Sequence, residues 1–290
     1  MKYGIYYAFW ENQWGGDYRK YSGKAAALGF DILEISCASI SNMTGSQISE
    51  LSRMALDSGI VLTGGYGPRR EENLASPDPN IVKNGFEFWK KTFDVLEALK
   101  INFVGGGLYS YWPVDFSGSF NKAEDLKRSV ENMKKLGVMA SAHKITLGME
   151  ALNRFEGYLI NTAEEALDYV KAVDCENVKV MLDTFHMNIE EDSLIDAIHK
   201  TGKYLGHFHI GEANRRPPGP GSRMDWEAIG KALRSIDYSG AVVMEPFVLM
   251  GGQVGADIKV WRELMPGAGE KELDLEAANS VSYIRRVFEG

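Results

Sequence analysis

Short apolar runs recur along the chain at intervals typical of repeated strand–helix units. There are eight such runs of five to seven residues, and their starts lie 26 to 44 residues apart. This is the spacing expected of consecutive βα units. The runs predict strands at residues 3–7, 31–36, 60–65, 101–106, 145–150, 178–183, 204–210 and 241–247.

Helical patterns separate several of these runs. Apolar residues recur at a three-to-four spacing between residues 86 and 96, and again between 126 and 133. Such a stripe indicates a helix that buries one face. Thr162 and Glu165 form the T-x-x-E signature of a capping box, which predicts a helix that starts at about residue 163.

The alternation of eight strands with helices predicts a (β/α)8 barrel of the TIM type, formed by residues 1–290 as a single domain. A doubly wound open sheet is the competing fold, and it usually carries a dinucleotide fingerprint. The three glycines at 105–107 lack the G-x-G-x-x-G spacing and the P-loop Lys-Ser/Thr pair. Close approach of the backbone to a ligand, or tight packing, explains them better.

Composition and charge narrow the possible function. The chain has 290 residues, of which 44% are hydrophobic and 25% charged, so a large core can form without a structural metal or disulfides. The net charge of −8 argues against general nucleic-acid binding. No apolar window is long enough for a membrane span, and the N-terminal stretch lacks the features of a signal peptide. We therefore expect a cytoplasmic protein without nucleic-acid or membrane partners.

Four residues of ligand type stand at the ends of the last four predicted strands: Glu150, Asp183, His209 and Glu245. In a parallel barrel, these strand ends meet at one rim, where barrel active sites lie. A single strand-end carboxylate is more often a helix cap or a salt-bridge partner. Four in register at successive strands favour a metal site instead. The oxygen-rich set suits one divalent cation such as manganese, cobalt or magnesium better than structural zinc.

The loops after these strands offer further candidates, each with an ordinary alternative. His186 either orients a substrate or is a loop histidine bonded to backbone, and the residues alone do not decide between the two. Glu156 either faces the same rim or is a solvated carboxylate. Arg215 and Arg216 either bind an anionic or sugar oxygen or are surface charges.

Aromatic side chains gather at the ends of the earlier strands. Isolated aromatic residues usually belong to the core, but rings at strand ends commonly flank the faces of sugars. This grouping favours a carbohydrate-type pocket. Its members are Tyr6, Tyr7, Phe9, Trp10, Trp14, Tyr66, Tyr109, Tyr111 and Trp112.

Such a site suits proton transfer at a carbon beside a carbonyl. A cation held by carboxylates polarises a carbonyl and acidifies the adjacent C–H. Glu150 and Glu245 come from strands five and eight, which lie across the barrel from one another. Two carboxyl groups on opposite sides of one carbon remove a proton from one face and return it to the other. This is the design of an epimerase, and it needs no redox cofactor.

Long motifs resemble the ketose 3-epimerases, the family of D-tagatose 3-epimerase and D-allulose (D-psicose) 3-epimerase. The resemblance runs over nearly the whole chain. The motifs that carry it are MKYGIYYAFW, YSYWPVDF, MEALNRFE, VKVMLDTFHMNIEEDS, GHFHIGEANRRPPG, AVVMEPF and IKVWRE.

The resemblance implies one manganese or cobalt ion held by Glu150, Asp183, His209 and Glu245, with the two glutamates as the acid–base pair. It implies a cis-enediolate between D-fructose and D-allulose, or between D-tagatose and D-sorbose. It also implies a homodimer or homotetramer. Residues that match positions at the carbonyl end of the sugar are Glu156, His186 and Arg215. Residues that match the wall around the far end are Tyr6, Trp14, Gly65, Gly107, Trp112 and Phe247.

One position departs from the family pattern. The family usually has a smaller side chain where this chain has Tyr66, and a tyrosine there would narrow the pocket or change contacts to the distal hydroxyls. Other hypotheses are an aldose–ketose isomerase on the same barrel, a sugar-binding barrel without catalysis, and a metal-dependent phosphodiesterase. The last would need more histidines than the five in this chain.

Overall fold

The computed structural model describes residues 1–290, and its centre is a closed barrel of eight parallel strands. Each strand pairs with the next along the chain, and β8 pairs with β1. This confirms the predicted (β/α)8 fold. The strands are β1 (Lys2–Tyr6), β2 (Ile32–Ser36), β3 (Val61–Gly65), β4 (Phe103–Gly106), β5 (Thr146–Glu150), β6 (Val178–Asp183), β7 (Leu205–Ile210) and β8 (Ala241–Met244).

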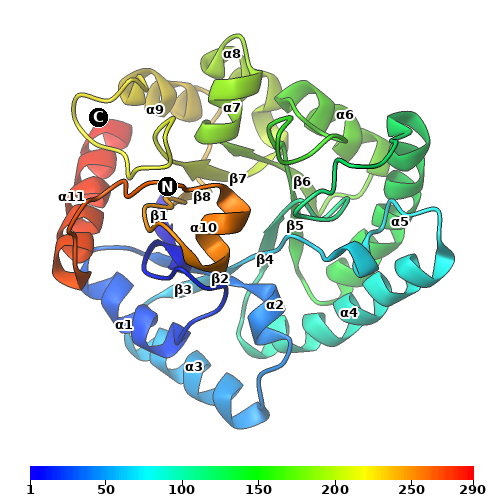
Figure 1. Cartoon of the computed structure of the whole chain (residues 1–290), viewed down its shortest axis with the longest axis horizontal. Helices are drawn as coiled ribbons and strands as arrows, with labels where there is room; N and C mark the ends of the chain where they lie inside the picture. Colours follow the sequence, from blue (N-terminus) through cyan, green and yellow to red (C-terminus); the bar gives the residue numbers. More distant parts are fainter.

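Helices surround the barrel, as Figure 1 shows in the view down its axis, and α10 lies inside their ring. The α-helices are α1 (Tyr18–Ala27), α2 (Cys37–Ile40), α3 (Gly45–Asp57), α4 (Pro79–Ala98), α5 (Lys122–Ala142), α6 (Ala163–Val173), α7 (Thr184–Glu190), α8 (Leu194–Thr201), α9 (Trp226–Ser235), α10 (Gly252–Ile258) and α11 (Glu270–Glu289). Short 3₁₀ turns are η1 (Tyr7–Phe9), η2 (Arg70–Glu72) and η3 (Gly202–Tyr204).

The predicted strands are correct in number and order, but some predicted ends are wrong. The run 241–247 was expected to be strand throughout, yet β8 stops at Met244. Pro246 has no N–H to donate to a neighbouring strand, so the pairing cannot continue through it. The strand predicted at 101–106 begins two residues later, at Phe103. The N–H of Ile101 instead donates to the carbonyl oxygen of Leu96, near the end of α4.

Helix starts follow local chemistry. Thr162 caps α6 by accepting the N–H of Glu165, as predicted, but the Glu165 carboxylate accepts from the N–H of Asn161 instead of closing a capping box.

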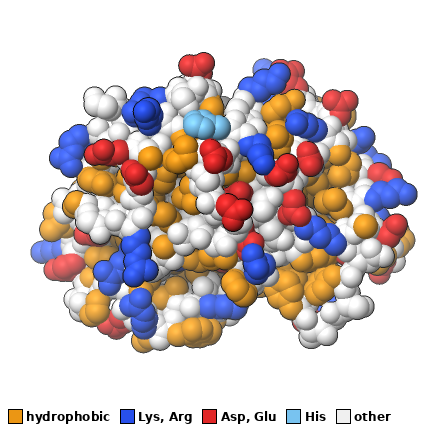
Figure 2. All heavy atoms as spheres, turned by 90° about the horizontal axis from the view of Figure 1, so that it is seen from above, with side chains coloured by type: hydrophobic (Ala, Val, Ile, Leu, Met, Phe, Trp, Pro, Cys, Tyr) orange, Lys and Arg blue, Asp and Glu red, His pale blue; other side chains and the backbone are white.

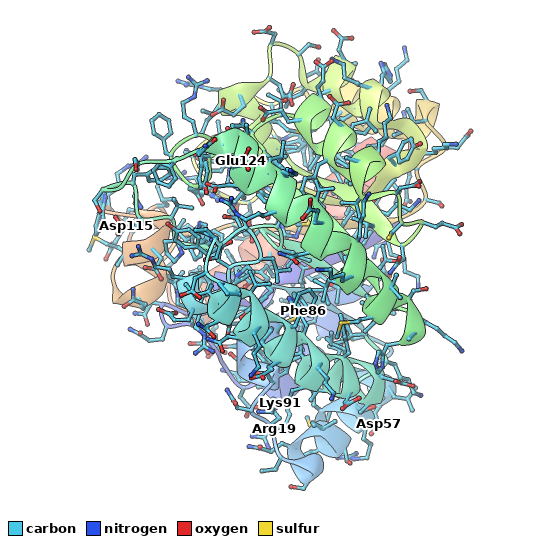
Figure 3. The ribbon with its side chains drawn as sticks, turned by 90° about the vertical axis from the view of Figure 1, so that its right-hand side faces the viewer. Arg19, Asp57, Phe86, Lys91, Asp115 and Glu124 are labelled. Carbon is cyan, nitrogen blue, oxygen red and sulfur yellow. The ribbon has the colours of Figure 1, made fainter.

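Figure 3 shows α4 and α5 side by side on the outer wall. Phe86 lies on α4, and Asp115 lies on the connection from β4 to α5, at the end of the barrel where α10 is found.

The core is formed by strand residues that face the helices and by the apolar stripes of the helices themselves. Its largest fully buried side chains include Trp89 on α4 and Trp226 on α9. The surface is mixed in charge, and Figure 2 shows Lys and Arg interspersed with Asp and Glu on the face drawn. None of the helices combines the length and apolar character that a bilayer crossing requires.

Two of the three glycines at 105–107 are explained by close packing. A Cβ on Gly105 would lie 2.3 Å from the sulfur of Met181, and one on Gly106 would lie 2.3 Å from the carbonyl oxygen of Tyr66. Gly106 also has a φ of +128°, which side chains rarely allow. The glycines therefore let the backbone of β4 run close to its neighbours at the rim.

Candidate active site

The ends of β5 to β8 bring four ligand-type side chains together. Glu150 is the last residue of β5, Asp183 ends β6, His209 lies near the end of β7, and Glu245 directly follows β8. One donor atom from each lies within 4.8 Å of the others. The barrel thus collects into one cluster the four residues that the sequence places a βα unit apart.

Asp183 has two roles in this cluster, one for each carboxylate oxygen. Its Oδ1 accepts the N–H of Phe185 at 2.7 Å and so caps α7. Its Oδ2 accepts from Arg215 Nη1 at 3.2 Å, and the same nitrogen donates to Glu245 Oε2 at 3.0 Å. Asp183 is therefore both a helix cap and a member of the site.

Two buried acceptor atoms in the cluster have no hydrogen-bond partner. They are Glu150 Oε1 and His209 Nδ1, which lie 3.8 Å apart, and Glu245 Oε2 lies 3.6 Å from the same nitrogen. Unsatisfied buried acceptors are costly, and a cation among them would satisfy both. The donor set of three carboxylates and one imidazole matches the ligands of manganese, cobalt or magnesium. The residues therefore fit a divalent cation.

The electrostatics of the cluster differ from one carboxyl group to the next. Burial, and then the neighbouring charge of Glu245, hold the pKa of Glu150 well above its usual range. Burial also raises the pKa of Asp183, but the positive charge of Arg215 and the nearby His186 and His209 outweigh it, so the net pKa is lowered. Burial thus favours the protonated form of Glu150, whereas positive charge favours the ionised form of Asp183.

A cavity of about 270 Å³ opens above the cluster. Most site residues predicted from the sequence line it, but Asp183, which is only 1% exposed, does not. Five of the aromatic residues expected in a carbohydrate-type pocket are buried outside the cavity, namely Tyr7, Phe9, Trp10, Tyr109 and Tyr111. Arg216 is an exposed surface charge away from it. The predicted lining residues are Tyr6, Trp14, Gly65, Tyr66, Gly107, Trp112, Glu150, Glu156, His186, His209, Arg215, Glu245 and Phe247. Their roles toward a ligand remain predictions, but the structure brings them to one place.

His186 lies on helix α7 rather than on a loop as expected, and its ring is bonded to the backbone. Its Nδ1 accepts the N–H of Asn153 at 3.2 Å, and the Asn153 side-chain amide lies 2.8 Å from the same atom. A neutral imidazole with Nδ1 as acceptor has its proton on Nε2. Burial lowers the pKa of His186, which favours this neutral form. Nε2 lies 4.0 Å from Glu150 Oε1, so the ring directs an N–H donor toward the acid cluster.

Arg215 and Glu156 also face the cluster rather than solvent. Arg215 is 5% exposed, and its guanidinium carbon lies 3.7 Å from the centre of the Phe185 ring. Its Nη2 lies 3.5 Å from Glu156 Oε1, and Glu156 also accepts from the Asn153 amide at 3.1 Å. The alternatives of surface charge and solvated carboxylate are therefore excluded for these two residues.

Aromatic rings form the wall opposite the acids. Trp14 lies edge-on to Trp112 at 5.8 Å and to Phe247 at 6.3 Å between ring centres. The Trp14 indole N–H donates to Asp257 of α10 at 2.7 Å, which connects the first loop to the last. Tyr6 lies 6.1 Å from Phe247. The cavity thus has a polar floor on one side and an apolar wall on the other.

Tyr66 lines the cavity, but its polar end is already engaged elsewhere. Its ring stacks on Phe88 of α4, with 4.5 Å between centres, and contacts Trp89 edge-on. Its hydroxyl donates to the buried carboxylate of Glu72. The Tyr66 hydroxyl is therefore not free to contact a sugar, while the narrowing of the pocket by its ring stays a prediction.

Glu34 and Asp257 also line the cavity, although the sequence did not predict them there. Glu34 lies in the apolar run DILEIS, and a carboxylate inside a predicted buried strand is the feature that should have singled it out. Asp257 lies in a short helix after β8, where no pattern separates it from solvated acids.

Comparisons with known proteins agree with this geometry. The family model for the xylose isomerase-like TIM barrel matches residues 23–264. A D-psicose 3-epimerase of Enterocloster bolteae is 51% identical over 290 residues, which cover 99% of this chain and 96% of that protein.

Solved structures superpose closely on the chain. A D-psicose 3-epimerase from Clostridium cellulolyticum H10, solved with D-tagatose, has a TM-score of 0.98 and 52% identity, with 99% of each chain covered. A D-psicose 3-epimerase solved in the presence of D-fructose has a TM-score of 0.98 and 48% identity, with both chains covered completely.

Proposed function

Because this chain belongs to the xylose isomerase-like TIM barrel family, and within it to the D-psicose 3-epimerase group of isomerases, we propose that it epimerises free ketoses at carbon 3. The interconversions proposed are D-fructose with D-allulose and D-tagatose with D-sorbose. Relatives with about half of their residues identical over the full length have D-psicose 3-epimerase as their name, and one was solved with D-tagatose.

The observation that carries the proposal is the placement of the two glutamates. Glu150 and Glu245 extend from β5 and β8, and an oxygen of each lies within 4 Å of His209 Nδ1 at the floor of one cavity. In the ring of eight strands, β5 and β8 are three steps apart rather than opposite as expected, but both glutamates line the cavity. We propose that a small ketose binds between the two carboxyl groups, as proton exchange on the two faces of one carbon requires.

Glu150, Asp183, His209 and Glu245 would hold one manganese or cobalt ion, with magnesium also compatible with the donor set. When bound, the ion supplies polarisation of the ketose oxygens, which makes the hydrogen on carbon 3 more acidic.

The two glutamates then divide the proton transfers. One carboxylate removes the proton from carbon 3, and the electrons of the broken C–H bond move into the carbonyl, which gives an enediolate. The other carboxyl group, protonated beforehand, delivers its proton to the opposite face of carbon 3. The configuration is inverted, and no net proton is gained or lost by the sugar. The pair returns to its starting state when the two carboxyl groups exchange protons with water or with sugar hydroxyls.

The other lining residues orient the sugar. In this proposal, the Nε2–H of His186 and the guanidinium of Arg215 would donate to oxygens at the carbonyl end, and Glu156 would accept from a hydroxyl. The rings of Tyr6, Trp14, Trp112 and Phe247 form a wall for the apolar face of the distal carbons, with the Gly65 and Gly107 backbone beside them. Tyr66 contributes to that wall without a free hydroxyl.

Sugar chromatography tests the proposal. The purified protein, treated with chelator and then given Mn²⁺, is incubated with D-fructose and the products are separated. An allulose peak that needs the cation is the expected result. An aldose product would replace the proposal with an aldose–ketose isomerase. Absence of product from fructose, tagatose and ribulose alike would refute it. The homodimer or homotetramer and the cytoplasmic location remain predictions.

A further inference from the structure

Glu34 is a buried carboxylate for which the proposed chemistry has no use. It is the third residue of β2, 1% exposed, and it pairs in register with Tyr6 of β1 and Thr63 of β3. Side chains alternate along a strand, so Glu34 faces the inside of the barrel while Leu33 and Ile35 face the helices. A charge in such a place is retained only with good partners.

Those partners come from β7, across the barrel, and from the neighbouring strand β3. Glu34 Oε1 accepts from His209 Nε2 at 2.7 Å, and Oε2 accepts from the Thr63 hydroxyl at 2.8 Å. His207, two residues before His209 on the same face of β7, has its Nε2 3.0 Å from Oε2 but without the alignment of a hydrogen bond. Glu34 thus has one well-formed bond to an imidazole, and that imidazole belongs to the acid cluster.

The two nitrogens of His209 face opposite ways. Nε2 faces Glu34, whereas Nδ1 faces Glu150 and Glu245 and has no hydrogen-bond partner. A neutral imidazole has only one N–H. Because the Glu34 carboxylate only accepts, the proton of the neutral ring is fixed on Nε2. Nδ1 is then left with a free lone pair directed at the place where the carboxylates converge.

Glu34, His207 and His209 also lie close enough together to be read as a second cation site. Three contacts argue against that reading. The Thr63 hydroxyl already donates to Glu34 Oε2, and the His207 ring is stacked on Phe103 with 4.3 Å between centres. The bond to His209 Nε2 occupies the remaining oxygen. The Glu34 carboxylate, which already accepts from two donors, is better suited to orient His209 than to bind a cation.

We propose that Glu34 is a positioning residue, which holds the His209 ring in the tautomer and orientation that present Nδ1 to a divalent cation. Carboxylates that accept from the second nitrogen of a ligating histidine act in this way in metal sites, and their loss weakens metal binding about 10–100-fold. The inference rests on the cation site of the proposed function. It adds a residue from β2, on the opposite half of the barrel from the four ligands.

Manganese binding to the cation-free protein tests this role directly. Free Mn²⁺ is measured by electron paramagnetic resonance during titration of the wild-type chain, Glu34→Gln and the exposed control Glu227→Gln. Glu34→Gln keeps the size of the side chain and removes its charge, so its Kd for Mn²⁺ is expected to rise about 10–100-fold. Glu227→Gln is expected to match the wild type, because Glu227 lies on the outside of α9.

The tautomer supplies a readout that does not depend on metal or activity. In ¹⁵N-histidine-labelled, cation-free protein above the titration range of the ring, His209 is expected to show its proton on Nε2. Glu34→Gln is expected to shift it toward a mixture of tautomers. An unchanged tautomer would overturn the inference. A lower melting temperature with an unchanged Mn²⁺ Kd would also overturn it, since Glu34 would then be merely structural.

A second variant guards against misfolding. Glu34→Asp keeps the charge, but its side chain is one methylene shorter, so the carboxylate lies farther from His209. Its Kd for Mn²⁺ is expected to lie between those of the wild type and Glu34→Gln. A Kd equal to that of the wild type would overturn the inference. A wild-type chain that binds no Mn²⁺ would overturn the proposed cation site as well. Tight binding by the wild type with no loss in Glu34→Gln would overturn the role of Glu34 alone.

Discussion

The two halves of the barrel rim carry different chemistry. Strands β5 to β8 end on carboxylates and an imidazole that converge within 4.8 Å. The ends of β1, β3 and β4 instead carry aromatic rings and glycines, such as Tyr6, Gly65 and Gly107, and these line the same cavity. One half can exchange protons and hold a cation, while the other offers ring faces and backbone.

This difference suggests that catalysis and sugar selection are separable on one fold. Under the proposed function, groups on the acidic half would contact the atoms that react, so their loss should lower kcat. Groups on the aromatic half would contact atoms that do not react, so their loss should raise KM. Glu34 is the exception, because it belongs to β2 but its contact with His209 lies on the acidic side.

The largest effect is expected from the two glutamates. Glu150→Gln and Glu245→Gln each block one proton transfer, so each should lower kcat by about 10²–10⁴-fold while the sugar still binds. Chromatographic rates and calorimetric binding of D-fructose measure the two quantities, with Glu227→Gln as the control. Substantial proton exchange at carbon 3 in the double variant would contradict the assignment of proton transfer to the acidic half of the rim.

A smaller loss of kcat/KM is expected when His186, the N–H donor beside the acid cluster, is replaced. His186→Leu removes the Nε2–H and leaves the Asn153 N–H without its acceptor. Loss of a hydrogen bond to a charged group costs about 1.5–3 kcal/mol, so kcat/KM should fall about 10–100-fold, mainly through kcat. His199→Leu on the exposed side of α8 is the control. A change confined to KM would place His186 with the aromatic half instead.

On the aromatic half, Trp112→Ala removes a ring that packs edge-on to Trp14. Aromatic pairs contribute about 0.5–1.5 kcal/mol, so KM for D-fructose should rise about 3–10-fold with little change in kcat. Trp261→Ala is the matched control, because Trp261 is 71% exposed. Steady-state kinetics distinguish the two parameters, and a dominant loss of kcat would show that the halves are not separable.

The smallest effect on activity is expected at Tyr66. Tyr66→Phe removes the bond to the Glu72 carboxylate and keeps the ring on Phe88, so the free energy of unfolding should fall by about 1.5–3 kcal/mol, measured by urea denaturation. Tyr204→Phe, on a half-buried ring, is the control. A marked change in KM for D-fructose would show that the Tyr66 hydroxyl affects the contacts of the sugar, one of the two effects predicted from the departure from the family pattern.

The sequence predicted the part of this protein that local patterns encode. The strands recur at regular intervals, and helix caps such as Thr162 depend on residues close by in the sequence. The (β/α)8 fold and the order of its elements could therefore be predicted from the sequence. In a parallel barrel every strand end meets one rim, and this rule alone placed Glu150, Asp183, His209 and Glu245 together.

Only the tertiary structure decided which side chains contact one another between distant strands. The contact between Glu34 and His209 joins residues 175 positions apart, and no spacing rule connects β2 with β7. The direction of the Tyr66 ring and the tautomer of His186 likewise depend on Phe88 and Asn153, which reach them only after folding. Periodicity determines which face of a strand a side chain occupies, but the neighbour it meets there is set by how the strands close into a barrel.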